Sequence, residues 1–293
     1  MLGAVLALLS SALWGTADYL GGSISRRLPV LTVIATSQAA ALIALLVAVP
    51  AAGGLLPPGR YVLWGVSYGL IGMVALAAFY RALATGTMGV VAPIAATGVV
   101  IPVLVALLAD GERPQWQQYV GMGMALIGIV LASAAPGVTP EPGESSARRT
   151  GVESIALAVV AAIGFGTVFV LIDRGSETSV GMTLLAARAS SILLLVAVVL
   201  LSRKPAGPWR PHWPMLAVIG VLDVSANGAF AFARGSTALS VVAVLGSLYP
   251  VTTVLLARHV DKERLSRAQA AGVITALVGV VLTATKIANS PPV

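Results

Sequence analysis

The chain has 293 residues, of which 58% are hydrophobic and 10% are charged, whereas about a quarter of the residues in a soluble domain are charged. Its formal net charge of +7 would suit a nucleic-acid-binding protein, but the basic residues lie between apolar runs and form no patch with aromatic residues, which excludes that class. The absence of cysteine excludes disulfides, thiolate metal sites and cysteine catalysis, and the two histidines lie too far apart in sequence to suggest a metal site.

Apolar runs of about 20 residues, the length that crosses the hydrocarbon core of a bilayer, recur along the whole chain. The first run, from Leu2 to Tyr19, has no basic segment before it and is predicted to be a span rather than a signal peptide. Charges and prolines divide the chain into ten predicted transmembrane helices: 2–20, 30–49, 62–82, 88–108, 116–135, 153–173, 180–201, 213–233, 238–258 and 268–287. The stretch 136–152 is rich in Pro, Gly, Ser and charge and is predicted to be a flexible linker.

The two halves on either side of this linker resemble each other. A shift of 151 residues aligns them without a gap over most of their length and places, for example, Gly128 on Gly279. Matches between glycines are weak evidence in so biased a composition, but a shared charged motif is specific. At the same shift, Asp110, Glu112 and Arg113 fall on Asp261, Glu263 and Arg264. We therefore predict one repeat at 1–135 and a second at 153–293.

Each repeat contains five predicted helices, an odd number, so the second repeat must enter the membrane in the opposite sense to the first. The predicted fold is an all-α polytopic membrane protein with ten transmembrane helices in two inverted five-helix repeats. Inverted repeats are typical of transporters, whose substrate site lies near the bilayer midplane where the repeats meet. The sequence contains no Gly-x-x-x-x-Gly-Lys-Ser/Thr motif for nucleotide binding, so we expect a gradient, or the substrate itself, to supply the energy.

Several short motifs carry a resemblance to a known family. They are Trp14-Gly15 in the first span, the stretch LLAAR that ends at Arg188, Pro250 in the ninth span, and Glu263-Arg264-Leu265 before the tenth. In this combination, the chain resembles EamA-type members of the drug/metabolite transporter superfamily. The first repeat departs from the pattern, with Ser37 in place of the arginine and Val99 in place of the proline. The resemblance implies a carrier but no particular substrate, because members carry amino acids, other metabolites, drugs or nucleotide sugars.

Two charged residues lie deep inside predicted spans. Arg188 lies about 12 Å into its span, where a charge costs roughly 2.5–3.5 kcal/mol to insert. Asp223 lies about 15 Å into the following, antiparallel span, so the two charges are predicted to lie at similar depths. Asn227 is four residues after Asp223 and shares its helical face. Three interpretations of Arg188 remain open: contact with substrate, an ion pair with Asp223, and snorkelling to the interface.

Other residues inside the spans are weaker candidates for the site. Asp18 shares a helical face with Trp14, whose ring suits either a cavity wall or an interfacial anchor. Ser247 and Tyr249 precede Pro250, which bends its helix and helps polar groups to face a cavity. No catalytic or metal-binding residue is predicted. The predicted substrate-binding residues are Trp14, Asp18, Arg188, Asp223, Asn227, Ser247 and Tyr249.

Charged residues near the span ends have a simpler explanation. Because they lie near the ends of the spans, their side chains can reach water. Four of them are predicted to snorkel to the interface: Arg81, Asp173, Arg234 and Arg258. The pairs Glu112-Arg113 and Glu263-Arg264 lie in the loops before the fifth and tenth spans. They are predicted to be solvated turn charges, with a gating contact as the alternative.

The leading functional hypothesis is a secondary active transporter that exports small polar or amphipathic metabolites such as amino acids, by alternating access through a central cavity. A flippase of lipid-linked carriers and a multidrug or organic-cation exporter are the alternatives, and an intramembrane enzyme lacks any suitable cluster of residues. The predicted partners are a small-molecule substrate and the lipid bilayer, with a homodimer as a further hypothesis. No cofactor is predicted beyond a coupled proton on Asp223 or Asp18.

The predicted location is the plasma or inner membrane, as a multi-pass protein. The distribution of basic residues among the loops favours both termini outside, whereas the family resemblance implies both termini inside.

Overall fold

The computed structural model describes residues 2–86, 88–132, 145–202, 209–260 and 267–284, and every element in these ranges is a helix. Apolar segments in a bilayer have no water to bond their backbone groups, and a helix satisfies those groups within the segment. The α-helices are α1 (Leu2–Ser25), α2 (Val30–Ala51), α3 (Arg60–Thr85), α4 (Met88–Ala96), α5 (Val100–Leu108), α6 (Trp116–Ala132), α7 (Ser145–Ser176), α8 (Val180–Ser202), α9 (Trp213–Arg234), α10 (Leu239–Gly246), α11 (Tyr249–Val260) and α12 (Arg267–Ala284).

Each of the ten predicted spans contains one or two helices, which confirms the all-α fold. Among the described residues, six segments are long and apolar enough to cross a membrane: α1, α2, α3, α8, most of α7, and α9 with the short turn before it. Shorter apolar helices occupy the other four spans, with α4 and α5 in one and α10 and α11 in another. α7 begins at Ser145, inside the predicted linker, so residues 145–152 extend this helix.

Two of the predicted spans are broken in the middle, and a proline accounts for each break. The 3₁₀ turn η1 (Thr97–Val99) separates α4 from α5, and a two-residue turn separates α10 from α11. Proline has no N–H and its ring clashes with the carbonyl four residues earlier, so the helix loses a bond at that point. Pro102 lies four residues after Gly98, and Pro250 lies four residues after Gly246. Each clash therefore falls at an observed break.

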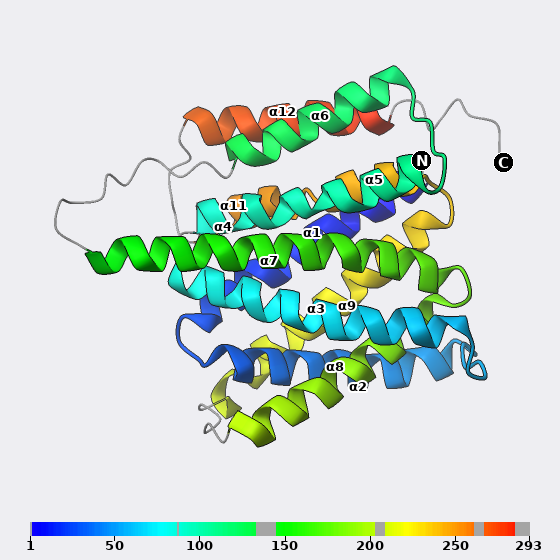
Figure 1. Cartoon of the computed structure of the whole chain (residues 1–293), viewed down its shortest axis with the longest axis vertical. Coiled ribbons are helices and arrows are strands. Elements are labelled where there is room, and N and C mark those ends of the chain that lie inside the picture. The colour runs from blue at the N-terminus through cyan, green and yellow to red at the C-terminus, as the bar shows by residue number, and fades with distance from the viewer. Residues whose placement is uncertain (1, 87, 133–144, 203–208, 261–266, 285–293) are drawn as a thin grey trace.

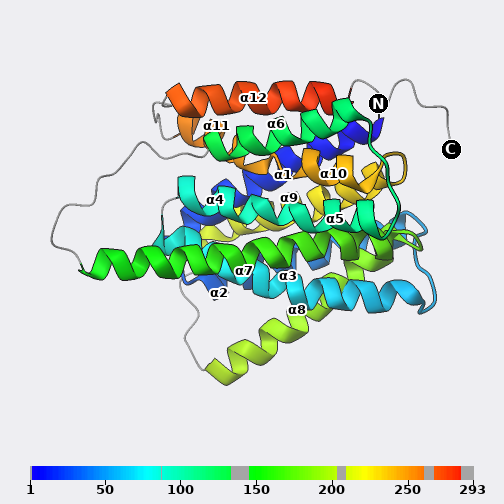
Figure 2. The same cartoon turned by 45° about the horizontal axis from the view of Figure 1, so that its top comes forward.

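The helices of the two halves pack in reciprocal pairs. α1 packs along α9, and α7, the counterpart of α1, packs along α3. In the same way, α2 packs against α9 and α8 packs against α3. α6 and α12 lie side by side at one edge of the bundle, and α2 and α8 lie at the opposite edge (Figure 1 and Figure 2). Exchanging the halves preserves this arrangement, as expected of two inverted repeats.

One pair of glycines shows how closely the repeats approach. A side chain at Gly128 in α6 would collide with the backbone of Ala276 in α12. A Cβ at Gly279 in α12 would lie 2.5 Å from the backbone nitrogen of Ala125 in α6. The shift of 151 residues relates the two glycines to each other and the two alanines to each other. The contact is therefore symmetric, and it depends on small residues, as is common between transmembrane helices.

The bundle is apolar on its outer faces and polar at several points inside. Leucines such as Leu193 and Leu201 are more than two-thirds exposed, whereas Arg188 and Asn227 are almost fully buried. A bilayer covers the exposed apolar side chains, so this distribution suits a membrane protein. The buried polar residues mark the interior positions where chemistry is expected.

Candidate functional site

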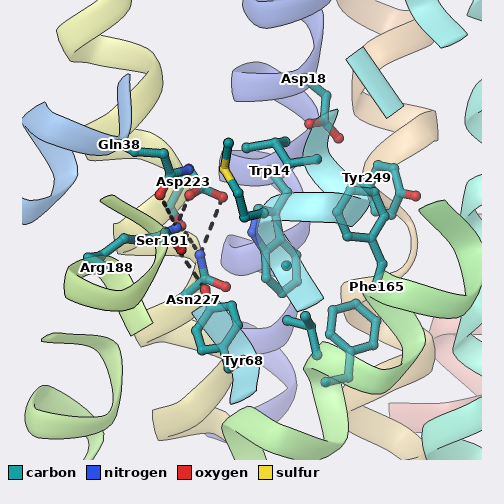
Figure 3. Close-up of a pocket in the computed structure, with 15 residues that line it drawn as sticks. Trp14, Asp18, Gln38, Tyr68, Phe165, Arg188, Ser191, Asp223, Asn227 and Tyr249 are labelled. Atoms are coloured by element: carbon teal, nitrogen blue, oxygen red, sulfur yellow. Dashed lines mark hydrogen bonds and ion pairs between the residues drawn. The ribbon is translucent and has the colours of Figure 1, made fainter. Parts of the chain in front are cut away.

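A cavity of about 70 Å³, here called the central pocket, lies between the two halves (Figure 3). It has room for several water molecules. Its lining residues on the long helices α1, α3, α8 and α9 fall near the middle of those helices. Helices of both repeats form its wall. The lining residues are Trp14, Asp18, Gln38, Tyr68, Gly72, Met73, Leu76, Phe165, Val168, Phe169, Arg188, Ser191, Asp223, Asn227 and Tyr249.

The central pocket lies on the symmetry axis of the repeats. Eight of its lining residues form four pairs related by the shift of 151: Trp14 with Phe165, Asp18 with Phe169, Gly72 with Asp223, and Leu76 with Asn227. Each pair places equivalent positions of the two repeats on the same cavity. Within every pair except the first, one residue is polar or charged and its partner is apolar. The backbone of the pocket is thus nearly symmetric, and its chemistry is not.

Arg188 is held by three side chains from three different helices. Its Nη1 donates to Oε1 of Gln38 on α2 at 2.6 Å, and its Nη2 donates to the Tyr68 hydroxyl on α3 at 3.2 Å. The same Nη2 donates to Oδ2 of Asp223 on α9 at 2.6 Å. Its Nε is buried without a hydrogen-bond partner among the described residues. The side chain points into the bundle and is 5% exposed, so the snorkelling interpretation of Arg188 was wrong.

Asp223 forms an ion pair with Arg188, which was one of the three interpretations of Arg188 left open by the sequence. Its carboxylate is 22% exposed and borders the central pocket, unlike the more deeply buried guanidinium. The Asn227 amide, one helical turn later, donates to the backbone carbonyl of Asp223 at 2.5 Å and to Oδ1 at 3.3 Å. Figure 3 shows the three side chains of Arg188, Asp223 and Asn227 grouped on one side of the pocket. A charged, hydrogen-bonding region is therefore preformed there.

Another part of the pocket wall is aromatic. The Trp14 ring lies 5.3 Å from the ring of Phe169, measured between centroids, and 5.7 Å from that of Phe230. Phe165, the repeat-related partner of Trp14, also lines the cavity. Trp14 is thus a cavity wall in this structure and not an interfacial anchor. The pocket offers a polar region and an aromatic region to one bound molecule.

The remaining predicted residues differ in their position. Asp18 and Tyr249 line the pocket, but no hydrogen bond or ion pair of the Asp18 carboxylate occurs among the described residues. The Tyr249 hydroxyl is buried without a partner in the same part of the chain. Ser247 is buried at the end of α10 and donates to the Val244 carbonyl, so it does not line the pocket. Six of the seven predicted residues are therefore brought together around one cavity.

Sequence reasoning missed three polar residues of the wall, Gln38, Tyr68 and Ser191. Gln38 lies 150 residues from Arg188 and Tyr68 lies 120 residues from it, so no local pattern connects them. It also missed Phe165, Phe169, Gly72 and Leu76, although the repeat contained the signal. Applying the shift of 151 to Trp14, Asp18, Asp223 and Asn227 leads to these four positions.

Two predictions about the peripheral charges were wrong. Asp173 does not snorkel: its side chain is 2% exposed and forms an ion pair with Arg234, with Nε to Oδ1 at 2.6 Å. Glu112 is not a solvated turn charge, because its carboxylate accepts hydrogen bonds from α10. Arg81 is exposed and pairs with Glu153 at 2.8 Å, as an interfacial residue can. The Arg258 side chain and the Glu263-Arg264 pair lie outside the described residues.

Comparison with known proteins identifies the family. A model described as "EamA-like transporter family" matches residues 1–134 and again residues 153–285. The chain belongs to the EamA-like transporter family. A solved structure titled only "Crystal structure of protein" is 18% identical, with a TM-score of 0.73 over 98% of this chain and 99% of that one. At this identity it supports the fold alone. No curated protein matches.

Family membership turns several expectations into findings. The EamA-like protein is a multi-pass membrane transporter and not an enzyme, and members of the family typically lie in the plasma membrane. Two matches to one family model confirm the internal repeat and the resemblance seen in the short motifs. The central pocket between the two EamA repeats is therefore the candidate transport site.

Proposed function

We propose that this EamA-like protein is a secondary active transporter that exports small polar or amphipathic metabolites, in particular amino acids with apolar side chains. The observation that carries the proposal is the Arg188–Asp223 ion pair in the wall of the central pocket, opposite an aromatic surface. A buried ion pair with no ligand to bind is costly, because both charges lose their hydration. A zwitterion replaces that lost hydration and uses both charges.

Arg188 is suited to the substrate carboxylate. A guanidinium binds a carboxylate through two parallel hydrogen bonds, and the Nε of Arg188 has no partner among the described residues. In our proposal the incoming carboxylate takes over donors that Asp223 holds in the empty pocket, and Asp223 then faces the substrate ammonium. Gln38 and Tyr68 keep the guanidinium in place during this exchange.

The apolar part of the substrate has a separate surface. Trp14, Phe165 and Phe169 lie on the wall of the same cavity, and burial of an apolar side chain against them contributes about 25 cal/mol per Å². An amino acid with a branched or aromatic side chain satisfies both regions at once. A small polar amino acid such as glycine leaves the aromatic region without a contact and binds more weakly.

Asp18 is the candidate for coupling to a proton. Its carboxylate lines the pocket from α1 and, unlike Asp223, has no arginine beside it in the described part of the chain. A carboxylate in that setting alternates between a proton and a cationic group more readily than one that is already paired. Export of substrate in exchange for an entering proton follows as the transport cycle.

The proposal is tested by binding to the purified protein with three matched ligands. Leucine has both charges, leucinamide has only the ammonium, and 4-methylpentanoate has only the carboxylate. We expect leucine to raise the unfolding temperature and to support counterflow in proteoliposomes, and the two analogues to bind at least tenfold more weakly. Equal binding of all three ligands, or of none among a panel of apolar amino acids, would exclude a zwitterion site.

A second candidate function is export of organic cations. It is favoured by one observation: the Asp18 carboxylate, which has no ion-pair partner among the described residues, lines the same pocket as the aromatic rings of Trp14 and Phe169. Cations bind to aromatic faces. In that case leucinamide and quaternary ammonium compounds bind more tightly than leucine. The same ligand panel therefore separates the two candidates.

A further inference from the structure

A second group of charged residues lies between the central pocket and the membrane face that bears the N-terminus. α7 and α9 run past the pocket towards this face, and their residues repeat the same order. On α7, Phe169 is followed one helical turn later by Asp173, and on α9, Phe230 is followed one turn later by Arg234. The two phenylalanine rings stack with centroids 4.8 Å apart, and the two charges pair at 2.6 Å. From the pocket towards the N-terminal face, an aromatic layer of Phe169 and Phe230 is thus followed by an ionic layer of Asp173 and Arg234.

The first repeat contributes to both layers. The Trp14 ring on α1 packs against both phenylalanines. In the loop after α5, Asp110 pairs with Arg174, the residue next to Asp173. The aromatic layer and the ionic layer therefore both join one repeat to the other.

Glu112 makes the most direct link between the repeats. Its Oε1 accepts from the backbone N–H of Leu239 at 2.7 Å, and its Oε2 accepts from the N–H of Ser240 at 3.2 Å and from the Ser240 hydroxyl at 2.6 Å. The first turn of a helix has free N–H groups and a partial positive charge, which a carboxylate satisfies. Glu112 of the first repeat thus caps α10, the first half of the broken span in the second repeat.

These contacts lie at one end of the bundle. Gly3, at the start of α1, packs against the end of α9, where a Cβ would lie 2.9 Å from the Ala233 carbonyl. α5 and α7 end at the same end of the bundle as this contact, and α10 begins there (Figure 2). Opening the pocket towards this face requires the loop after α5 to separate from α10 and α7.

We propose that Glu112 is a gating residue, which with Asp110, Asp173, Arg174, Arg234 and Ser240 forms an N-face gate. This inference rests on the proposed transport function, and it adds a residue outside the substrate site. Glu112 stabilises the state that is closed towards the N-terminal face, and the cap on α10 breaks each time the pocket opens there. The N-face gate acts on the conformational equilibrium and not on substrate affinity.

The absence of native cysteine makes a direct test simple. Met73→Cys places one thiol in the wall of the central pocket, and a membrane-impermeant maleimide then reports which face the pocket opens to. Intact cells and inverted vesicles present opposite faces, and an N-terminal tag identifies which preparation exposes the N-terminal face. In this background, Glu112→Gln removes the charged cap. The matched control is Glu153→Gln, which breaks the exposed Arg81–Glu153 pair at the other end of α7.

We expect Glu112→Gln to raise the labelling rate of Cys-substituted position 73 from the N-terminal face about tenfold, which corresponds to about 1.4 kcal/mol in the equilibrium. Glu153→Gln should leave the rate unchanged. The proposal would be overturned if Glu112→Gln labels at the same rate as the Met73→Cys protein with Glu112 intact. It would also be overturned if Glu153→Gln raises the labelling rate by the same factor. Labelling needs no substrate, so its outcome is independent of whether the proposed amino-acid substrate is correct.

A second variant tests the same contact if Glu112→Gln fails to reach the membrane. Ser240→Asp keeps Glu112 and places a second carboxylate against it, so repulsion should open the N-terminal face and raise labelling. Combining Ser240→Asp with Glu112→Lys restores an attractive pair and should return labelling to the low rate. A double variant that labels as fast as Ser240→Asp alone contradicts a direct contact between these positions during gating.

Discussion

Removing either partner of the Arg188–Asp223 ion pair leaves the other charge inside the membrane domain, and the two cases differ in burial. After Asp223→Asn, the guanidinium, 5% exposed, keeps only the neutral Gln38 and Tyr68 as partners. Losing one partner of a buried pair costs about 3–5 kcal/mol, and we expect a loss near the lower limit because these two hydrogen bonds remain. After Arg188→Gln, the carboxylate, 22% exposed, can bind water in the pocket and the Asn227 amide. Arg188→Gln should therefore lower the free energy of unfolding by about 2 kcal/mol, because solvent screens the remaining carboxylate.

The assay is thermal unfolding of the purified variants in detergent, together with substrate exchange in proteoliposomes. The double variant Arg188→Gln/Asp223→Asn removes both charges of the ion pair and should recover most of the lost stability. It should not recover exchange, because the substrate then has neither of its charged partners. Full transport by the double variant would refute a substrate role for the pair and assign it to structure alone. If Arg188→Gln lowers the stability more than Asp223→Asn does, burial of the remaining charge does not determine the cost.

Three further predictions concern other parts of the molecule. Gly128→Leu should lower the unfolding temperature, because it forces α6 away from α12, whereas Gly123→Leu, with open space around its Cβ, should not; equal effects would contradict the close contact. Asp18→Asn should abolish the dependence of transport on a pH gradient while exchange of substrate persists, and a retained dependence would exclude Asp18 as the coupling group. Trp14→Ala should weaken substrate binding about tenfold by calorimetry, with Trp14→Phe close to unchanged, and unaltered binding would remove the ring from the site.

The sequence predicted the helices because a membrane leaves few alternatives. A run of 20 apolar residues must be helical in lipid, so the spans follow from length and composition. The breaks were also predictable in kind, because Pro102 and Pro250 each free a carbonyl four residues earlier. What prolines alone do not specify is the outcome of the bend, a 3₁₀ turn in the first repeat and a two-residue turn in the second.

The candidate site was predictable only in part. Arg188 and Asp223 were found because charges are rare inside spans and adjacent antiparallel spans bring equal depths together. Gln38 and Tyr68 were missed because uncharged polar residues are common and their contacts join distant parts of the chain. Glu112 was misread for the same reason: its partners lie 127 and 128 residues away, and a loop carboxylate has no local signature of a helix cap.

The inverted repeat gives the two membrane faces of this transporter similar backbones, but the side chains at the two faces differ. A symmetric backbone gives the protein two similar closed arrangements, one for each membrane face. At the N-terminal face, Phe169 stacks on Phe230 and Asp173 pairs with Arg234, and in our proposal these two contacts close that face. The shift of 151 places Asp18 with Gly22 and Phe79 with Leu83 at the equivalent positions of the first repeat. Glycine and leucine cannot form an ion pair, and Leu83 is buried as an apolar core residue. The Asp173–Arg234 pair therefore has no counterpart at the equivalent positions of the first repeat. In our proposal, this difference favours the state of the empty transporter that is closed at the N-terminal face.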